Sequence, residues 1–276
     1  MTEPPAQETI ARQHNPLLDA LSEVIGEQID PASTKVSLAR PDKGSRSAAA
    51  HLLLCRIGND RVVGLKRCYD NPEFIRRELV VAEAKKLVSL PRYGVNALCG
   101  IKLDGTSGVA NWELAAGWED KMVLLIDYGK YGYAKNFVEL NPAEIKDAKN
   151  FCRQYGGWAA FNFLLGVNDR NEGNFVLFTD SQTLHSVDNE DGPYDSNGNE
   201  ASPMAIIDAM RQHFQKLTVA AAKAECAEAG KTGFMETWKE ISNAVGSLAF
   251  LEGRELSLTR ARLGLNPADV IALFFP

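Results

Sequence analysis

The stretch from Gly166 to Gly192 constrains the fold of this 276-residue chain more than any other segment. It reads G-V-N-D-R-N-E-G-N-F-V-L-F-T-D-S-Q-T-L-H-S-V-D-N-E-D-G. Apolar residues at helical spacing precede it, and two short apolar runs separated by turn-forming residues follow its polar beginning. The pattern predicts a long buried helix that ends near Gly166, a polar loop over 167–174, and a hairpin with strands over 175–178 and 183–187.

The loop and the hairpin together carry the polar groups that phosphoryl transfer needs. Asp169 and Asn174 lie on one loop, and the returning strand of the hairpin brings Asp188 beside them. In such a reaction one carboxylate orients the acceptor hydroxyl, while a carboxamide and a second carboxylate hold the divalent cation that bridges the phosphates. The pattern D-R-x-x-x-N alone is a surface loop far more often than a catalytic one. The prediction therefore depends on the whole combination, together with an upstream lysine.

The first part of the chain predicts a small antiparallel sheet. Three strands are expected, over 35–39, 49–57 and 61–68. A turn that contains glycine, serines and charged residues joins the first two strands over 41–47, and G-N-D at 58–60 turns the second strand into the third. Lys66 lies on the third strand, where its ammonium group can supply the cation that holds phosphate groups.

A helix is expected directly after this sheet. Asn71-Pro72 opens it, and the segment 73–89 carries both apolar residues and the glutamates Glu78 and Glu83. Further on, the apolar run K-M-V-L-L-I predicts a buried strand over 121–126, and the segment 127–132 is interpreted as a flexible connection. We place the boundary between two lobes at this connection.

The rest of the chain predicts mainly helices. Asn141, Pro142 and Glu144 form a helix-start signature with an N-cap, a first-turn proline and a capping box. Apolar spacing indicates further helices near the N-terminus and in the last third, over 16–28, 204–217, 219–229 and 235–250. The expected fold class is α+β, with 1–30 as an N-terminal extension and helix, 31–128 as the first lobe and 129–276 as the second.

These motifs resemble those of the phosphatidylinositol 3/4-kinase-like superfamily of atypical protein kinases. D-R-x-x-x-N followed by a hairpin and an aspartate is especially similar to the catalytic and metal-binding loops of type II phosphatidylinositol 4-kinases and related bacterial kinases. Val187-Asp188-Asn189 looks like the second element of that pattern, and V-V-G-L-K at 62–66 looks like its lysine strand. The resemblance covers the segment 35–190 and implies a two-lobed protein-kinase-like fold, with a sheet and a helix in the first lobe and mostly helices in the second.

The resemblance also implies a role for each matching residue. Asp169 would be the catalytic aspartate, and Asn174 and Asp188 would bind Mg²⁺ or Mn²⁺. Lys66 would hold the α- and β-phosphates of ATP and would pair with Glu78. The other implied nucleotide-binding positions are Lys43, Gly44 and Ser45, where the family has its phosphate loop, and Ile126 and Asp127 at the lobe boundary.

Three positions leave alternatives open. Glu83 is a rival of Glu78 as the partner of Lys66. Asn171 stands where many lipid kinases of the family carry a histidine, which weakens the lipid-kinase interpretation. His185 lies three positions before Asp188 rather than two, so we assign it no role and expect it at the edge of the core.

The composition of the chain argues against nucleic acid and integral membrane association. The net charge is −6 and the pI is about 5.4, so no overall positive charge favours nucleic acid. No apolar run approaches the roughly 20 residues of a membrane span, and the N-terminus lacks the apolar segment of a secretory signal. The five cysteines are scattered without metal-ligand spacing, which is typical of reduced thiols. We therefore expect a cytoplasmic protein without integral membrane association.

The sequence as a whole predicts an ATP- and Mg²⁺-dependent kinase that transfers the γ-phosphate to a hydroxyl group. A protein Ser or Thr is preferred over a lipid headgroup, because the chain is acidic and has no basic or amphipathic membrane segment. By analogy with the bacterial kinases, the chain would act as an effector, a toxin or a regulator. An effector would be delivered into another cell. A partner or activator protein would bind the kinase. The alternatives are a phosphoinositide lipid kinase, a nucleotidyl transferase on the same fold, and a pseudokinase that binds a partner.

Overall fold

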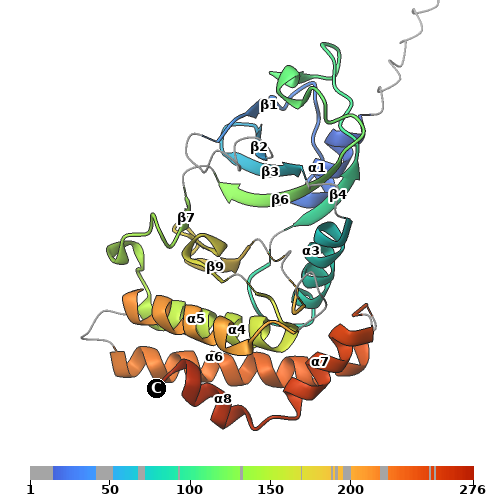
Figure 1. Ribbon diagram of the computed structural model, residues 1–276. Helices are drawn as coiled ribbons and strands as arrows, with labels where there is room; N and C mark the ends of the chain where they lie inside the picture. The colour runs from blue at the N-terminus through green and yellow to red at the C-terminus, as the bar shows by residue number, and fades with distance from the viewer. Residues whose placement is uncertain are drawn as a thin grey trace, which may run out of the picture.

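The computed structural model describes residues 15–41, 52–67, 72–92, 94–130, 133–168, 170–187, 189, 192–194, 200–217, 223–248, 250–251 and 253–276. It shows an α+β fold in which a six-stranded sheet lies above a layer of helices, with helix α3 between the two (Figure 1). The α+β class predicted from the sequence is thereby confirmed.

The six-stranded sheet is mixed rather than purely antiparallel. Its strands are β1 (Val36–Ala39), β2 (Leu52–Ile57), β3 (Arg61–Arg67), β4 (Val95–Cys99), β5 (Val109–Ala110) and β6 (Met122–Lys130). Their spatial order is β4-β6-β3-β2-β1-β5, and every neighbouring pair is antiparallel except β1 with β5. The predicted turn between β2 and β3 is present, and Gly58 adopts a φ of 62° there, which favours glycine.

Helix α1 (Pro16–Ile25) packs against the sheet beside β4 and β6. The side chain of Asn15 caps it by accepting hydrogen bonds from the N–H groups of Leu17 and Leu18, at 3.1 and 3.4 Å. Gly26 ends the helix in the left-handed conformation, so the helix stops at Ile25 rather than at residue 28. Apolar residues of α1 and the sheet form a first hydrophobic core, which includes Leu17, Leu21, Val36, Leu38, Leu53, Cys55, Val63, Leu65, Val123 and Leu125.

The lower layer consists of α4 and the helices packed around it. They are α4 (Ala148–Leu165), α5 (Pro203–Leu217), α6 (Lys223–Asn243), α7 (Gly253–Leu263) and α8 (Pro267–Phe274). Among the described residues, no helix is both long and apolar enough to cross a membrane. The helical last third that the sequence predicts is confirmed.

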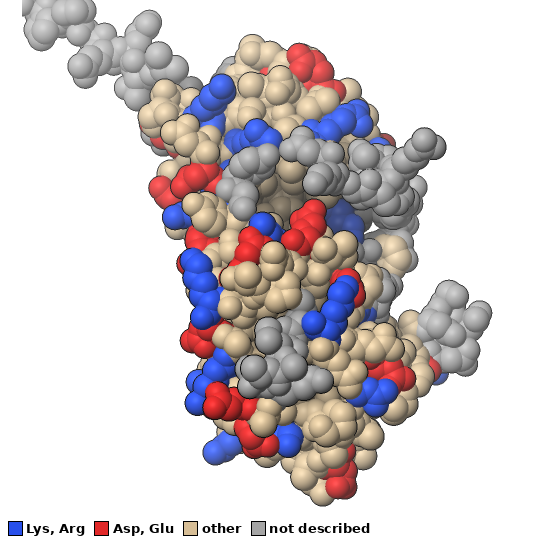
Figure 2. All heavy atoms as spheres, turned by 90° about the vertical axis from the view of Figure 1, so that its left-hand side faces the viewer, with Lys and Arg blue, Asp and Glu red and all other residues tan. Residues whose placement is uncertain are grey.

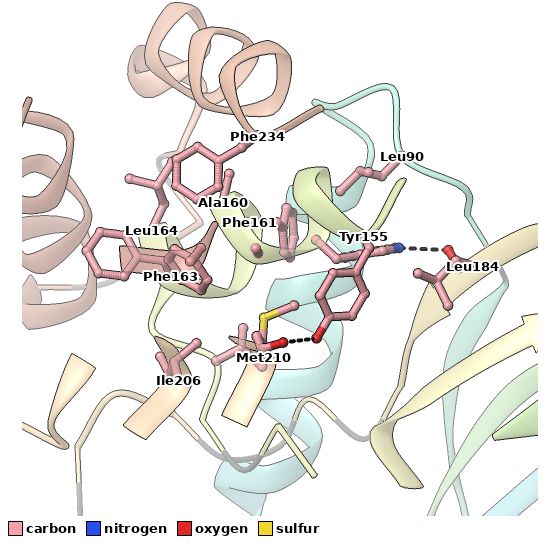
Figure 3. Close-up of a cluster of buried hydrophobic side chains, with 14 of the residues drawn as sticks. Leu90, Tyr155, Ala160, Phe161, Phe163, Leu164, Leu184, Ile206, Met210 and Phe234 are labelled. Carbon is pink, nitrogen blue, oxygen red and sulfur yellow. Dashed lines mark hydrogen bonds between the residues drawn. The ribbon is translucent and has the colours of Figure 1, made fainter. Parts of the chain in front are cut away.

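Aromatic side chains of α4 form the centre of a second hydrophobic core, shown in Figure 3. The polar groups of two of these side chains, a hydroxyl and an indole N–H, have hydrogen-bond partners. Tyr155 Oη donates a hydrogen bond to the carbonyl of Met210 at 2.7 Å, and Trp158 Nε1 donates to the carbonyl of Leu184 at 2.7 Å. Because both polar groups have partners, α4 can be buried along its whole length from Tyr155 to Leu165.

A second, three-stranded sheet lies beside this core. It contains β7 (Ala134–Asn136), β8 (Phe175–Phe178) and β9 (Thr183–Ser186), in that order and antiparallel. The predicted hairpin is therefore confirmed, with its second strand ending one residue early. Strand β7 was not predicted, since three residues carry too little alternation to be recognised.

Two further predicted boundaries are wrong. The capping box of Asn141 and Glu144 is present, but it starts only a short 3₁₀ turn (Pro142–Glu144). Helix α4 begins later, after Asp147, whose side chain accepts from the N–H of Asn150 at 2.9 Å. Strand β6 runs through the predicted flexible connection as far as Lys130, because this segment stays paired with β3.

Helices α4 and α6 approach each other closely at glycines. A Cβ added to Gly156 would lie 1.8 Å from the carbonyl oxygen of Gly230, and one added to Gly233 would lie 1.9 Å from that of Arg153. The break in apolar spacing predicted two separate helices here, over 219–229 and 235–250. Helix α6 instead runs unbroken through Gly230 and Gly233. A side chain at Gly233 would meet the backbone of α4, and one at Gly230 would meet the ring of Phe275 at 2.7 Å, so glycine is needed at both positions.

We expect Gly156→Ala to lower the free energy of unfolding by about 2 kcal/mol, because the added methyl group meets backbone that cannot move aside. Alanine is the better helix former by about 1 kcal/mol, so an open position would give the opposite sign. Urea unfolding followed by circular dichroism measures the difference. Gly246→Ala is the matched control, since a Cβ there meets nothing within 4 Å. Equal stability of the two variants would contradict the close helix crossing.

Candidate functional site

Helix α3 (Pro72–Lys85) lies between the six-stranded sheet and the helical layer (Figure 1). Near its start, Ile75 packs with Leu124 and Ile126 of the sheet. Further along, Val81 and Ala84 belong to the core of the helical layer. The side of α3 that faces the β8–β9 hairpin carries charged residues that are nonetheless buried, and these residues build the candidate site.

Arg170 is the central cation of this site and is only 2% exposed. Its Nε donates to the carbonyl of Asn168 at 2.8 Å, within its own loop. Its Nη1 reaches across to the end of the hairpin, where it donates to Ser186 Oγ at 2.7 Å and to the carbonyl of Val187 at 3.2 Å. The guanidinium group therefore joins the loop after α4 to the segment after β9.

Asn189 completes the contact between this segment and α3. Its N–H and its Nδ2 donate to the two carboxylate oxygens of Glu78, at 2.5 and 3.2 Å. Its Oδ1 accepts from Arg170 Nη1 at 3.3 Å and from Ser186 Oγ at 3.1 Å. Asn189 and Ser186 are fully buried and Glu78 is 1% exposed, so these bonds are made out of contact with solvent.

Asn174 lies next to this network at the end of a 3₁₀ turn (Glu172–Asn174). Asn171 caps the turn, its side chain accepting from the N–H of Gly173 at 2.8 Å. The carbonyl of Asn174 accepts from the N–H of Val187 at 2.9 Å, and its side chain is buried. The two loop positions 170 and 174 thus both contact the segment that follows β9.

The predicted residues Asp169 and Asp188 themselves lie outside the described residues, as do Lys43, Gly44 and Ser45. Their roles stay predictions. The structure does describe the residues on either side of the two aspartates. The side chain of Arg170, the residue after position 169, donates to the carbonyl of Val187 and to the side chain of Asn189, the residues on either side of position 188.

The predicted ion pair between Lys66 and Glu78 is not formed. Lys66 lies on β3 between Leu52 and Leu124 of the neighbouring strands, as expected for the lysine strand. In the described part of the chain, the carboxylate of Glu78 accepts its hydrogen bonds from Asn189 instead. The rival Glu83 is exposed and pairs with Lys86 at 2.5 Å. Glu78 is thus directed toward the hairpin because its side of α3 faces the lower layer.

Ile126 lies within strand β6 as predicted, and Asp127, predicted to begin a connection, belongs to the same strand. Ile126 stands between β3 and β4. The N–H of Asp127 donates to the carbonyl of Gly94 at 2.9 Å, and its carboxylate binds Arg61 in bidentate fashion at 3.0 and 2.5 Å. The Asp127 N–H and side chain are therefore already engaged in the fold, and a nucleotide contact at this pair stays a prediction.

Lys85 is a second buried cation beside the network. Its Nζ donates to the carbonyl of Ser186 at 2.9 Å and lies 5.2 Å from the centre of the Trp158 ring. Burial lowers the pKa of Lys85 to about 7, and the neighbouring Glu78 opposes that shift while Arg170 adds to it. A cation here interacts with a carbonyl dipole and a ring face, which compensate part of the lost hydration.

His185 lies at the edge of the core, as the sequence predicts. It is 5% exposed, and its ring stands perpendicular to that of Phe178 with the centroids 4.7 Å apart. Burial, followed by the charge of Lys85, lowers the pKa of His185 to about 3. A neutral histidine at physiological pH fits a structural position, and we assign it no chemistry.

One surface cavity lies near this network and another lies far from it. One of about 230 Å³ opens where β6 ends and borders Arg61, Asp127 and His185. A larger one, of about 550 Å³, lies between the start of α1 and the loop 102–108 and includes none of the predicted site residues. Cavity size therefore does not identify the site. We take the buried polar network as the candidate site, because burying charged groups costs free energy unless they have partners, and such clusters are frequent at functional sites.

Sequence reasoning missed several members of the network, namely Lys85, Arg170, Ser186 and Asn162, whose Oδ1 accepts from Ser186 Oγ at 3.5 Å. Arg170 and Asn189 were visible as letters of the two motifs, but neither was given a role. Lys85 was one charge among several on a predicted helix. No sequence signal distinguishes it from exposed Lys86, because only the packing of α3 against the hairpin buries one and leaves the other in solvent.

We expect Lys85→Met to remove a pH dependence of stability. The pKa of Lys85 is about 7 in the folded protein, against an ordinary value of 10.5. Below pH 7 both states hold the proton and the full cost of the buried charge is present. As pH rises from 7 toward 10.5, the folded protein releases the proton first and the cost is relieved.

The free energy of unfolding of the wild type should therefore rise relative to Lys85→Met above pH 7, by at most about 1.4 kcal/mol per pH unit. Urea titrations of both proteins at about pH 6, 7, 8 and 9 measure the difference. Because all other groups are shared, the difference isolates Lys85. A difference that stays constant over this range would contradict the lowered pKa.

No protein-family model matches the chain, and no curated protein matches its sequence. The assignment of function therefore depends on the motifs and on the geometry of the network around Arg170.

Proposed function

We propose that this chain is an ATP- and Mg²⁺-dependent kinase with a two-lobed protein-kinase-like arrangement, which transfers the γ-phosphate to a protein Ser or Thr. One observation carries the proposal. Arg170 holds the loop of the D-R-x-x-x-N motif against the segment after β9, through Ser186, Val187 and Asn189. The two sequence elements that carry the candidate aspartates are thereby neighbours in space.

The position of Lys66 is a second support. Protein kinases place the phosphate-binding lysine on the third strand of a sheet that a helix follows. Lys66 lies on β3, and α3 follows directly in the chain. The separate cores of the sheet with α1 and of the lower helices are also what two lobes on either side of a cleft require.

The proposed reaction divides the work among these residues. The acceptor oxygen forms a bond to the γ-phosphorus, the bond from that phosphorus to the β-γ bridging oxygen breaks, and ADP leaves. The carboxylate of Asp169 orients the acceptor hydroxyl and takes its proton, while the ammonium of Lys66 holds the α- and β-phosphates.

The donor set at the loop fits a magnesium ion. Mg²⁺ prefers oxygen ligands and is commonly held by one or two carboxylates together with phosphates and water. The carboxamide of Asn174 and the carboxylate of Asp188 are such donors, and the Asn174 side chain is buried beside the segment that carries Asp188. When bound, the ion would neutralise charge on the phosphates.

The charge distribution on one face of the molecule favours a protein acceptor over a lipid. Figure 2 shows Lys and Arg interspersed with Asp and Glu over the face at the left of Figure 1. A face of mixed sign supplies no continuous positive field, of the kind that an anionic lipid surface or a phosphate backbone would need. A polar polypeptide segment with a free hydroxyl suits such a surface better.

We expect Asp169→Asn and Asp188→Ala to fail in different ways. Asp169→Asn removes the base but keeps the shape, so phosphate transfer should fall by about 10²–10⁴-fold while nucleotide affinity changes little. Asp188→Ala removes a metal ligand, so it should lose metal-dependent nucleotide binding together with transfer. Transfer of radiolabelled phosphate and calorimetric binding of an ATP analogue measure the two properties separately.

Full transfer activity in Asp169→Asn would show that Asp169 only anchors its loop. Mass spectrometry of the labelled product tests the reaction type in the same experiment. A gain of one phosphate is expected, whereas a gain of AMP would identify a nucleotidyl transferase. A wild-type protein that binds nucleotide and labels nothing in a lysate would favour the pseudokinase alternative.

We also expect Lys66→Met to abolish most transfer without unfolding the protein. A half-buried strand lysine contributes little to stability, whereas its charge is needed at the phosphates. The melting temperature and the transfer rate of the variant test the two parts of this expectation. Lys86→Met is a control on an exposed lysine just after the end of α3, and it should retain wild-type transfer.

A further inference from the structure

We propose that Glu78 is a positioning residue that holds the metal-binding segment through Asn189, and that it does not act through Lys66. This inference rests on the proposed kinase function, in which Asp188 is a metal ligand. It assigns to the glutamate of α3 a partner in the segment after β9, in place of the lysine that the family resemblance implies.

The geometry of Asn189 is the first step. Its carboxamide lies between an anion and a cation, with Nδ2 toward the carboxylate of Glu78 and Oδ1 toward the guanidinium of Arg170. Only a group with both a donor and an acceptor can serve both neighbours. An aspartate here would oppose Glu78 with a like charge, and an alanine would leave both neighbours short of a hydrogen bond.

The backbone contact is the second step. The N–H of Asn189 donates to Glu78 Oε1 at 2.5 Å. Asn189 directly follows Asp188 in the chain, so the carboxylate of Glu78 holds the residue next to the proposed metal ligand. A hydrogen bond to a buried carboxylate is stronger than one to a neutral acceptor, and it is well suited to this task.

Helix α3 holds the same segment at a second point. Glu78 and Lys85 are seven residues apart, or about two helical turns, so they lie on one side of the helix. Glu78 binds Asn189, and Lys85 binds the carbonyl of Ser186 at 2.9 Å. The segment 186–189 is therefore held at both of its ends by one helix face.

The helix is itself anchored to the lower layer. Arg77, 1% exposed, donates through Nη1 to Glu255 of α7 at 2.9 Å and through Nη2 to the carbonyl of Leu165 at the end of α4. Arg76 adds a second bond to Glu255 at 3.1 Å. Because α3 is fixed to α4 and α7, Glu78 presents its carboxylate to Asn189 from a rigid support.

A residue that acts on a metal ligand through one intermediate group changes metal affinity by about 10–100-fold when it is replaced. Glu78→Gln turns an amide donor toward Nδ2 of Asn189, and Asn189→Asp turns a carboxylate toward Glu78. Each single variant should therefore weaken binding of Mn²⁺ by about 10-fold or more, with nucleotide affinity at saturating Mn²⁺ nearly unchanged.

The double variant Glu78→Gln/Asn189→Asp is the decisive one. The new amide at position 78 can accept from the backbone N–H of position 189 and donate to the new carboxylate there, which can in turn accept from Arg170. The bonds between positions 78 and 189 and the bond to Arg170 are restored with the donors exchanged, while the 3.4 Å bond from Asn189 Nδ2 to the carbonyl of Ser186 is lost. Mn²⁺ affinity should therefore return to within about threefold of the wild type. Glu83→Gln, on the exposed side of the same helix, is the matched control and should bind Mn²⁺ like the wild type.

The experiment measures Mn²⁺ binding by electron paramagnetic resonance in the presence of a non-hydrolysable ATP analogue, and analogue affinity by calorimetry at saturating Mn²⁺. Thermal denaturation confirms that each variant is folded, and the double variant tests the inference even where a single one fails to fold. A folded double variant without Mn²⁺ affinity would overturn the inference.

A different failure separates this inference from the proposed function. If Glu78→Gln keeps its Mn²⁺ affinity and loses nucleotide affinity as Lys66→Met does, Glu78 acts through Lys66 and the inference is wrong, while the kinase proposal stands. If the wild-type protein binds neither Mn²⁺ nor the analogue, the proposed function is wrong and the inference with it.

Discussion

The guanidinium of Arg170 is the group on which the rest of the site depends. Buried at 2% exposure, it must find hydrogen-bond acceptors inside the protein, because a cation without them would not be stable there. It finds acceptors on its own loop, at Asn168, and on the segment after β9, at Val187 and Asn189. Meeting that requirement draws together two parts of the chain that belong to different elements.

Helix α3 supplies a negative charge that balances Arg170, and it supports the segment after β9. Its Glu78 carboxylate balances the cations of the network through Asn189, while Arg77 ties the helix to Glu255 and to the end of α4. This explains why α3 has charged residues on a buried side. Its apolar residues pack against the sheet at one end and into the helical core at the other, and its charged residues determine what it contacts between them.

The arrangement separates rigid support from the parts that would meet ligands. Helix α4 and the β8–β9 hairpin are buried in the second core, and the polar loop emerges from that support beside α3. Groups that must be held in a fixed geometry for phosphoryl transfer gain from such a base, since positioning and electrostatics supply most of the catalysis. The proposed function follows from this placement together with the residues of the motif.

The sequence by itself determined the elements whose signals are local. The helix start at Pro16, the β2–β3 turn, the β8–β9 hairpin and Lys66 on its strand all follow from spacing and turn residues within a few positions. Tertiary structure alone decided the partners of buried charges and the extent of β6. Glu78 and Asn189 are 111 residues apart, and Arg61 and Asp127 are 66 apart. No local pattern encodes such pairs, because the free energy that selects them comes from burial, which exists only once the layers have packed.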